Sequence, residues 1–201
     1  DDSIGETCVI KIFSKTLKDL AEGEMLQLQK AQNGDANEED YLRIIYSKTA
    51  SLFEASCVSA AISVGSPDVY IQAARDYSVS LGIAFQIQDD ILDYSGTEAV
   101  GKPLGADILE QKITMPLLGA LKQVDSDVAS GIIKKVEEIT GHPEYREEIL
   151  DFVKEHGGID YATSALSGYV EQAIRALDVL PDSKAKEYLV ELAYYTGKRT
   201  K

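Results

Sequence analysis

Apolar side chains recur at intervals of three to five residues along most of the chain, the spacing that places them on one face of an α-helix. Between residues 10 and 32 they are Ile10, Phe13, Leu17, Leu20, Met25 and Leu28. No alternation of apolar and polar residues that would predict a strand runs beyond four residues. The pattern therefore predicts an all-α protein, and because no linker or fixed-period repeat interrupts it, residues 1–201 are expected to form a single domain.

Turn-forming residues separate the predicted helices. The helices are expected at residues 10–32, 37–64, 67–94, 113–124, 128–140, 143–156, 159–180 and 183–195. Asn37 and Ser66 are expected to cap the second and third of them. Residues 1–8 are predicted to be an irregular start, and residues 95–111, which contain three glycines, are predicted to be a loop.

A polar stripe lies near the end of the third predicted helix, within the otherwise apolar run Phe85–Tyr94. It consists of four residues at relative positions 0, 3, 4 and 7: Gln86, Asp89, Asp90 and Asp93. These positions share one helix face, at the end where the helix dipole is already negative. Either a divalent cation such as Mg²⁺ balances the carboxylates, or they form a solvated helix end.

Other candidate residues occur before and after this stripe. Lys48 and Thr49 lie within a helix rich in small residues, so the lysine either extends to solvent or points at an anion. Gly23 indicates either a close helix crossing or a glycine tolerated on the surface. In the later loop, Lys102 and Lys112 flank Asp107, and loops rich in glycine let backbone amides and lysines close on phosphate oxygens.

Composition narrows the classes of function. A hydrophobic content of 44% and a charged content of 27% are typical of a globular protein, and no apolar run of about 18 residues predicts a membrane span. The net charge of −14 argues against a nucleic-acid partner. Cys8 and Cys57 are expected to be buried free thiols in a reducing compartment. His142 and His156 lack the spacing of metal ligands and are expected at the surface or at helix ends.

Five segments, in order, resemble the trans-isoprenyl (polyprenyl) diphosphate synthases. Phe85–Asp93 resembles the second aspartate-rich motif of that family, and Tyr46–Thr49 resembles its Lys-Thr motif. The segment from Gly101 to Pro116 resembles the loop that follows the second motif. Glu22–Gln27 and Gly157–Ala162 are similar to further stretches.

The resemblance implies an isoprenoid synthase-type helical bundle and a prenyltransferase. Such an enzyme condenses isopentenyl diphosphate with an allylic diphosphate through a Mg²⁺-assisted carbocation mechanism. The implied metal ligands are Asp89, Asp90 and Asp93. The implied catalytic and substrate-binding residues are Lys48, Thr49, Gln86, Lys102, Asp107 and Lys112, with Arg199 on the isopentenyl diphosphate side. The implied cavity-lining residues are Glu24, Gln27 and Phe85.

The sequence departs from the family pattern in one respect. The Gly-Lys-Arg segment and the first aspartate-rich motif of the family are not found here, and Asp1-Asp2 lacks the remainder of that motif. We therefore expect this chain by itself not to elongate prenyl chains. The alternatives are a non-catalytic regulatory subunit or inactive fragment of the same fold, and a helical interaction domain with an acidic surface. A homodimer and a cytoplasmic location are expected by resemblance only.

Overall fold

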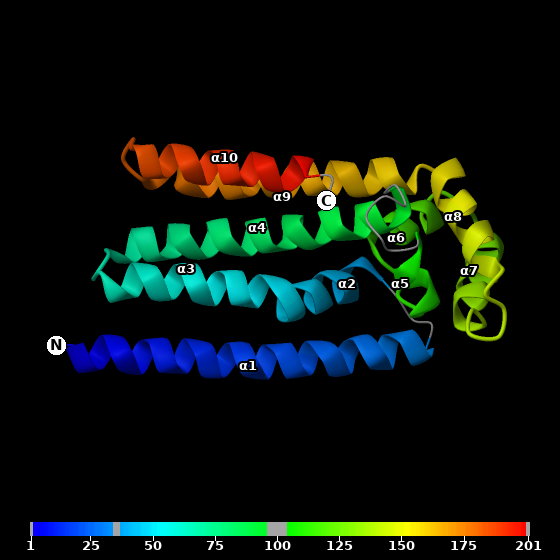
Figure 1. Cartoon of the computed structure of the whole chain (residues 1–201), viewed down its shortest axis with the longest axis horizontal. Helices are drawn as coiled ribbons and strands as arrows, with labels where there is room; N and C mark the ends of the chain where they lie inside the picture. Colours follow the sequence, from blue (N-terminus) through cyan, green and yellow to red (C-terminus); the bar gives the residue numbers. More distant parts are fainter. Residues whose placement is uncertain (1, 34–36, 96–103, 200–201) are drawn as a thin grey trace. The chain divides into compact units, whose positions relative to one another are not determined.

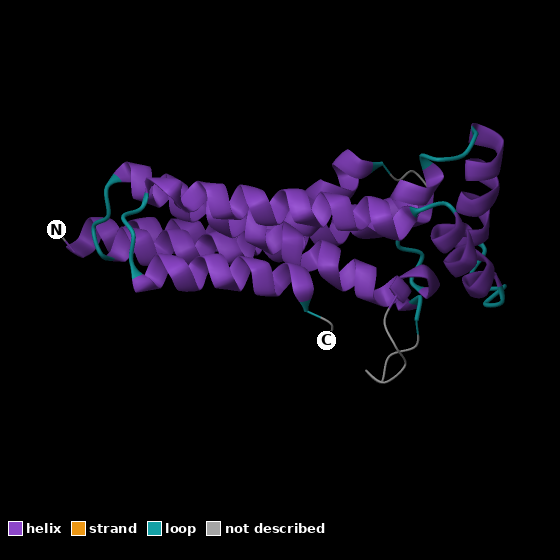
Figure 2. Cartoon of the chain, turned by 90° about the horizontal axis from the view of Figure 1, so that it is seen from above, coloured by secondary structure: helices purple, strands orange, loops and turns teal. Residues whose placement is uncertain are grey.

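The computed structural model describes residues 2–33, 37–95 and 104–199. These residues form helices joined by turns and loops, with no strand among them (Figure 2). The all-α prediction is therefore confirmed. Within the same ranges, no helix has both the length and the apolar character needed to cross a membrane.

The helices follow one another along the chain as labelled in Figure 1. They are α1 (Asp2–Asn33), α2 (Glu38–Ile45), a π-helical segment (Tyr46–Ala50), α3 (Ser51–Ser63), α4 (Asp68–Ser95), α5 (Ala106–Leu109), α6 (Met115–Leu121), α7 (Ser126–Glu137), α8 (Tyr145–Glu155), α9 (Gly158–Ala176), a 3₁₀ turn (Leu177–Val179) and α10 (Lys184–Lys198). Each predicted helix is present, with ends that differ by a few residues except at the start of α1.

Three local expectations were wrong. Residues 2–8 continue α1 rather than forming an irregular start, because one glycine costs a helix only about 1 kcal/mol relative to alanine. The predicted helix over residues 37–64 is divided by the π-helical segment. The predicted loop contains α5, which begins after Gly105. The φ of Gly105 is 74°, a backbone angle that only glycine adopts at low cost. Residues 96–103 of that loop lie outside the described residues.

The cap predicted for the second helix is confirmed. The Asn37 side-chain oxygen accepts the backbone N–H of Asp40 at 2.9 Å, and its amide donates to the Asp40 carboxylate at 2.7 Å. Both groups of the asparagine are therefore used to start α2.

The chain divides into two compact units. Unit 1 comprises Asp1–Glu24, Arg43–Gln86 and Leu166–Arg199, and unit 2 comprises Met25–Leu42, Ile87–Ala165 and Thr200–Lys201. Helices α1, α2, α4 and α9 contribute residues to both units. That all 201 residues act as one domain stays a prediction.

In unit 1, two glycines allow helices to approach the π-helical segment closely. A side chain added at Gly23 of α1 would place its Cβ 2.8 Å from the Cβ of Ser47. One added at Gly82 of α4 would lie 2.6 Å from the Cα of Ala50. The close helix crossing is thus the correct one of the two explanations offered for Gly23. Tyr77 of α4 also donates its hydroxyl to the Leu189 carbonyl of α10 at 2.8 Å.

Unit 2 has its own apolar core. It joins the last turn of α4 to α5, α6, α7 and α8, and its fully buried members include Tyr94, Ile108, Leu117, Ile149 and Val153. This core holds the residues that follow the acidic stripe in the sequence.

Candidate functional site

The Lys-Thr motif lies on the π-helical segment of unit 1. Lys48 extends its ammonium to within 3.0 Å of the Glu24 carboxylate, and its side chain is only 23% exposed. Of the two explanations offered for Lys48, the lysine therefore points at an anion, which here is a carboxylate of the same chain. π-Helical turns occur often at functional sites, because the extra residue redirects the neighbouring side chains.

Thr49 connects this motif to the beginning of the polar stripe. Its hydroxyl donates to the side-chain oxygen of Gln86 at 2.8 Å, and both residues are half-buried. The two residues are 37 positions apart in the sequence. Two of the predicted site segments therefore meet within unit 1.

Arg199, the residue that follows α10, contacts Phe85, which precedes Gln86 on α4. Its guanidinium sits 3.9 Å from the centre of the Phe85 ring, and it donates to the Phe85 carbonyl at 3.1 Å. A cation–π contact and a hydrogen bond thus hold Arg199 against α4. The ring of Phe53 lies 5.6 Å from that of Phe85, so the aromatic pair also links α3 to α4.

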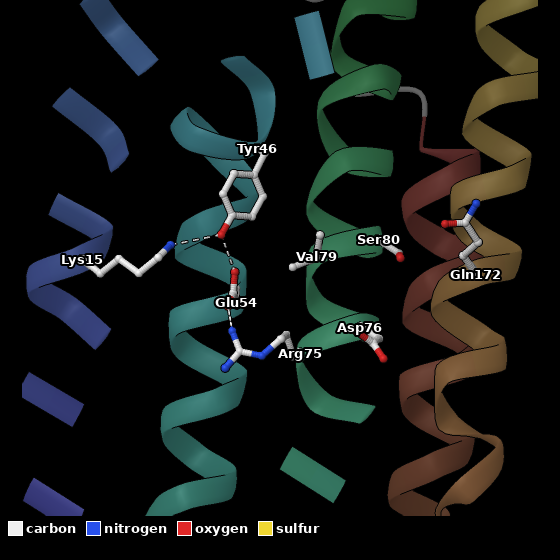
Figure 3. Close-up of a pocket in the computed structure, with 8 residues that line it drawn as sticks. All are labelled: Lys15, Tyr46, Glu54, Arg75, Asp76, Val79, Ser80 and Gln172. Atoms are coloured by element: carbon white, nitrogen blue, oxygen red, sulfur yellow. Dashed lines mark hydrogen bonds and ion pairs between the residues drawn. The ribbon is translucent and has the colours of Figure 1, made fainter. Parts of the chain in front are cut away.

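Unit 1 also contains a polar network that was not predicted from the sequence. The Tyr46 hydroxyl donates to Glu54 at 2.7 Å, Lys15 donates to the Tyr46 oxygen at 3.4 Å, and Arg75 pairs with Glu54. Figure 3 shows these side chains converging from α1, the π-helical segment, α3 and α4. The available signal in the sequence was Glu54, the single charged residue of α3.

This network borders a cavity of about 530 Å³. The cavity is lined by Lys15, Tyr46, Glu54, Arg75, Asp76, Val79, Ser80 and Gln172 (Figure 3). Arg75 pairs with Glu54, and the two cations and two carboxylates of the wall balance in formal charge. Hydrogen bonding to Asp19 at 2.6 Å is the main reason why the pKa of Lys15 lies above its ordinary value.

In unit 2, the aspartates of the stripe have different surroundings. Asp90 is only 2% exposed, and its carboxylate accepts the Tyr41 hydroxyl at 2.7 Å. Asp89 is half-buried. Gln27, a predicted cavity residue on α1, is also half-buried.

Asp93 faces the start of α5. Its two carboxylate oxygens accept the backbone N–H groups of Ala106 and Asp107, each at 3.1 Å. Burial raises the pKa of Asp93 above its ordinary value, and the nearby charge of Asp107 raises it further. The two backbone hydrogen bonds and the charge of Lys112 act in the opposite direction.

Lys112 forms a second charged group next to Asp93. Its ammonium lies 2.9 Å from Asp107 and 2.7 Å from Glu110. Burial lowers the pKa of Lys112, but the hydrogen bonds to Glu110 and Asp107 outweigh this effect and raise the pKa above its ordinary value. The lysine is therefore held as a cation beside Asp107. Lys102, the other predicted lysine of the loop, lies outside the described residues.

The acidic residues supply hard oxygen donors of the kind that Mg²⁺ prefers. Among residues 2–33, 37–95 and 104–199, however, no group of three or more acidic, histidine or cysteine side chains is placed to hold a metal ion. One or two carboxylates are enough for a Mg²⁺ ion that completes its coordination with substrate phosphates and water, and the acidic stripe can supply them.

The cysteines and histidines take part in none of the contacts described above. Both cysteines are half-buried free thiols, and burial raises the pKa of Cys57. His142 contacts the Glu144 carboxylate at 3.0 Å, and His156 contacts the Phe152 carbonyl at 2.9 Å. The expectation that the histidines lie at the surface or at helix ends is confirmed, since His142 is exposed and His156 is the C-cap residue of α8.

Comparisons with known proteins agree with the sequence motifs. The profile of the family described as Polyprenyl synthetase matches residues 3–153, more than half of the chain. The chain is 38% identical over 192 residues to the octaprenyl diphosphate synthase of Haemophilus influenzae, which covers 95% of this chain and 58% of that protein. The chain thus spans less than two thirds of the length of this relative.

Solved structures give the same result. A decaprenyl diphosphate synthase from Rhodobacter capsulatus is 38% identical, with a TM-score of 0.88 over 97% of this chain and 60% of that one. A polyprenyl synthase from Caulobacter crescentus, complexed with calcium and isoprenyl diphosphate, is 31% identical, with a TM-score of 0.88 over 96% of this chain and 59% of that one. By family profile, sequence identity and all-α isoprenoid synthase fold, the chain belongs to the polyprenyl synthetase family.

Proposed function

We propose that the chain serves in the synthesis of trans-polyprenyl diphosphates, in which isopentenyl diphosphate is condensed with an allylic diphosphate. The observation that carries this proposal is the 2.8 Å hydrogen bond between Thr49 and Gln86. It joins the Lys-Thr motif to the first residue of the second aspartate-rich motif, so that two segments with proposed diphosphate-binding roles are held together.

The proposed reaction begins when the diphosphate leaves the allylic carbon and a carbocation forms. The charge that develops on the departing oxygens requires fixed positive groups nearby. Lys48, Lys102 and Lys112 are proposed to supply them, and Thr49 and Gln86 to orient the diphosphate. Lys48 would exchange its contact with Glu24 for a diphosphate oxygen. Isopentenyl diphosphate then adds to the cation and a proton is lost, so no protein nucleophile is required.

Family membership implies a divalent metal, and we propose Mg²⁺ held through Asp89 and its neighbours on the stripe. When bound, Mg²⁺ would stabilise the negative charge of the leaving diphosphate. The Caulobacter relative, which is described as complexed with calcium and isoprenyl diphosphate, supports this pairing of a divalent cation with a diphosphate. Arg199 keeps its proposed role on the isopentenyl diphosphate side. Glu24, Gln27 and Phe85 remain predicted cavity-lining residues, although none of them lines the cavity shown in Figure 3.

A homodimer and a cytoplasmic location remain predictions from the family. No observation favours a non-catalytic subunit over an enzyme, since the similar proteins reported above are named as synthases.

The proposal is tested by calorimetric titration of the chain with an allylic diphosphate, with and without Mg²⁺. We expect binding that requires Mg²⁺ and that weakens about tenfold or more in Asp89→Ala, as expected for a lost charge contact. Asp151→Ala, which removes an exposed carboxylate of α8, is the matched control and should bind like the unaltered chain. Binding that is absent, or equal in Asp89→Ala, would contradict the proposal.

The expectation that this chain alone does not elongate is tested separately. Incubation with isopentenyl diphosphate, an allylic diphosphate and Mg²⁺, followed by chromatography of the products, should yield no longer prenyl diphosphate. Any elongated product would show that the segments missing from the family pattern are dispensable.

A further inference from the structure

The short helix α5 begins without a capping side chain of its own. Its N-cap residue is Gly105, which has no side chain and a φ of 74°. The first backbone N–H groups of a helix have no partner within the helix and need one from elsewhere. Asp93 supplies it from the last turn of α4, through one carboxylate oxygen to Ala106 and the other to Asp107.

The backbone of Asp93 takes part in the same arrangement. Its carbonyl accepts the Gly105 N–H at 2.8 Å, so three consecutive amides of the α5 start bond to this one residue. Asp93 thus does for α5 what an N-cap side chain normally does.

Apolar packing next to these bonds defines where α5 lies. Tyr94 and Ile108, the immediate neighbours of Asp93 and Asp107, are both fully buried in the core of unit 2. On the other side, a Cβ at Gly105 would lie 3.0 Å from the Cγ of Arg146. The start of α5 is therefore confined by contacts on more than one side, and Asp93 provides the polar part.

Asp107 passes this placement on to Lys112. The Lys112 N–H donates to the Asp107 carbonyl at 2.9 Å, and its ammonium donates to the Asp107 carboxylate at 2.9 Å. A displacement of the α5 start would move Asp107, and with it the two Asp107 oxygens that bond to Lys112.

We propose that Asp93 is a positioning residue, which caps α5 and thereby places the Asp107–Lys112 ion pair. The part of the proposal that concerns Lys112 and a diphosphate rests on the function proposed above, whereas the cap itself does not.

The cap is tested by amide hydrogen exchange measured by NMR on the complete chain. In Asp93→Ala, the amides of Ala106 and Asp107 should exchange about tenfold faster, the effect of losing a helix cap. Asp93→Asn, which keeps one acceptor oxygen, should give a smaller increase and provides a milder variant should Asp93→Ala fold poorly. Unchanged exchange at both amides in both variants would overturn the proposal.

Asp125→Ala is the matched control. The Asp125 side chain caps α7 by accepting the N–H groups of Asp127 and Val128 at 3.1 and 3.0 Å. Its loss should speed exchange at those two amides and leave Ala106 and Asp107 unchanged. Faster exchange at Ala106 in this variant would mean that exchange reports general loosening, which would overturn the assignment to Asp93.

The positioning of Lys112 is tested by a double-mutant cycle on the binding of inorganic diphosphate with Mg²⁺. Asp93→Ala and Lys112→Met should each weaken the binding of diphosphate. The double variant should bind with the same affinity as whichever single variant binds less tightly. Excess Mg²⁺ should not restore Asp93→Ala. The positioning role would be overturned if the two losses of affinity multiplied in the double variant, or if excess Mg²⁺ restored binding by Asp93→Ala. Absence of binding by the unaltered chain would refute the proposed function, and hydrogen exchange would still decide the cap.

Discussion

At the scale of single residues, the acidic stripe contains side chains with different physical tasks. Asp90 is almost fully buried, and a buried polar group costs free energy unless it is hydrogen-bonded. The Tyr41 hydroxyl provides one such bond. Asp93 instead bonds to backbone amides at the start of α5. One helix face thus carries carboxylates that form hydrogen bonds within the fold, as well as those proposed to take part in the chemistry.

Removing the Tyr41 hydroxyl should therefore cost stability. We expect Tyr41→Phe to lower the free energy of unfolding by about 1.5–3 kcal/mol, the range for hydrogen bonds to charged groups. Urea denaturation followed by circular dichroism measures the effect. Tyr194→Phe, at a side chain that is 51% exposed, should change stability by less than about 0.5 kcal/mol. Equal stability of the two variants would contradict a role for Tyr41 in holding Asp90.

At the scale of helices, close crossings position the Lys-Thr motif. The π-helical segment is approached by α1 at Gly23 and by α4 at Gly82, where a side chain would collide. Because these crossings hold the backbone on either side of Thr49, they also set the distance at which Thr49 meets Gln86. Small residues at these points are thus part of how the candidate site is built.

Gly82→Ala should be destabilising although alanine is the better helix former. The new Cβ would lie 2.6 Å from a backbone atom of Ala50, and forced overpacking costs about 1–3 kcal/mol. Thermal unfolding monitored by circular dichroism measures the change. Gly168→Ala in α9, where no atom lies within 4 Å of the new Cβ, should instead stabilise by about 0.5–1 kcal/mol. Stabilisation by Gly82→Ala would mean that the crossing is looser than described.

Helices of unit 2 are joined by a polar contact that depends on pH. The ammonium of Lys122 and the hydroxyl of Tyr161 both donate to the Glu38 carboxylate. The bond from Lys122 is the larger cause that lowers the pKa of Glu38 below its ordinary value, and the bond from Tyr161 adds to it. Because the folded pKa is lowered, this stabilisation is present above the unfolded pKa and is lost as the pH falls through the folded pKa.

Lys122→Met should therefore destabilise at neutral pH by up to about 1 kcal/mol, since the pair is partly exposed. The difference from the unaltered chain should narrow as the pH falls through the lowered pKa of Glu38, because its carboxylate then becomes protonated. Urea denaturation at several pH values measures it. Lys134→Met, which removes an exposed pair with Glu138, should show little effect at either pH. A difference that stays constant with pH would exclude Glu38 as the partner that matters.

At the scale of the whole molecule, the surface combines a net charge of −14 with exposed apolar side chains. On α1, Ile10, Phe13 and Leu17 are exposed by 66%, 43% and 68% and lie on one helix face. Exposed apolar groups of this kind promote association between protein molecules. The predicted homodimer can therefore be examined at α1.

We expect the chain to self-associate and Leu17→Glu to weaken that association about tenfold or more, since burying one leucine contributes about 1.5–3 kcal/mol. Sedimentation velocity over a range of concentrations measures the dissociation constant. Val128→Glu, which places the same charge at an exposed apolar position of α7, should leave association unchanged. A monomer at all concentrations would refute self-association, and equal effects of the two variants would exclude α1 as the contact.

The sequence by itself determined the helices, the motifs and the family. Helical periodicity and turn residues are local, so the long helix α4 and its end near Ser95 could be read directly from the order of residues. The same holds for the Asn37 cap, whose partner is three residues away. The motif residues of the candidate site were also found in this way, because each lies in a short recognisable segment.

The tertiary structure alone decided which of these residues meet. Thr49 bonds to Gln86 across 37 positions and Tyr41 to Asp90 across 49, and no local pattern encodes such pairs. The helix α5 escaped prediction because its cap comes from Asp93 rather than from the adjoining sequence. The sequence therefore specified which side chains are available, whereas packing between distant segments assigned each carboxylate and lysine its partner.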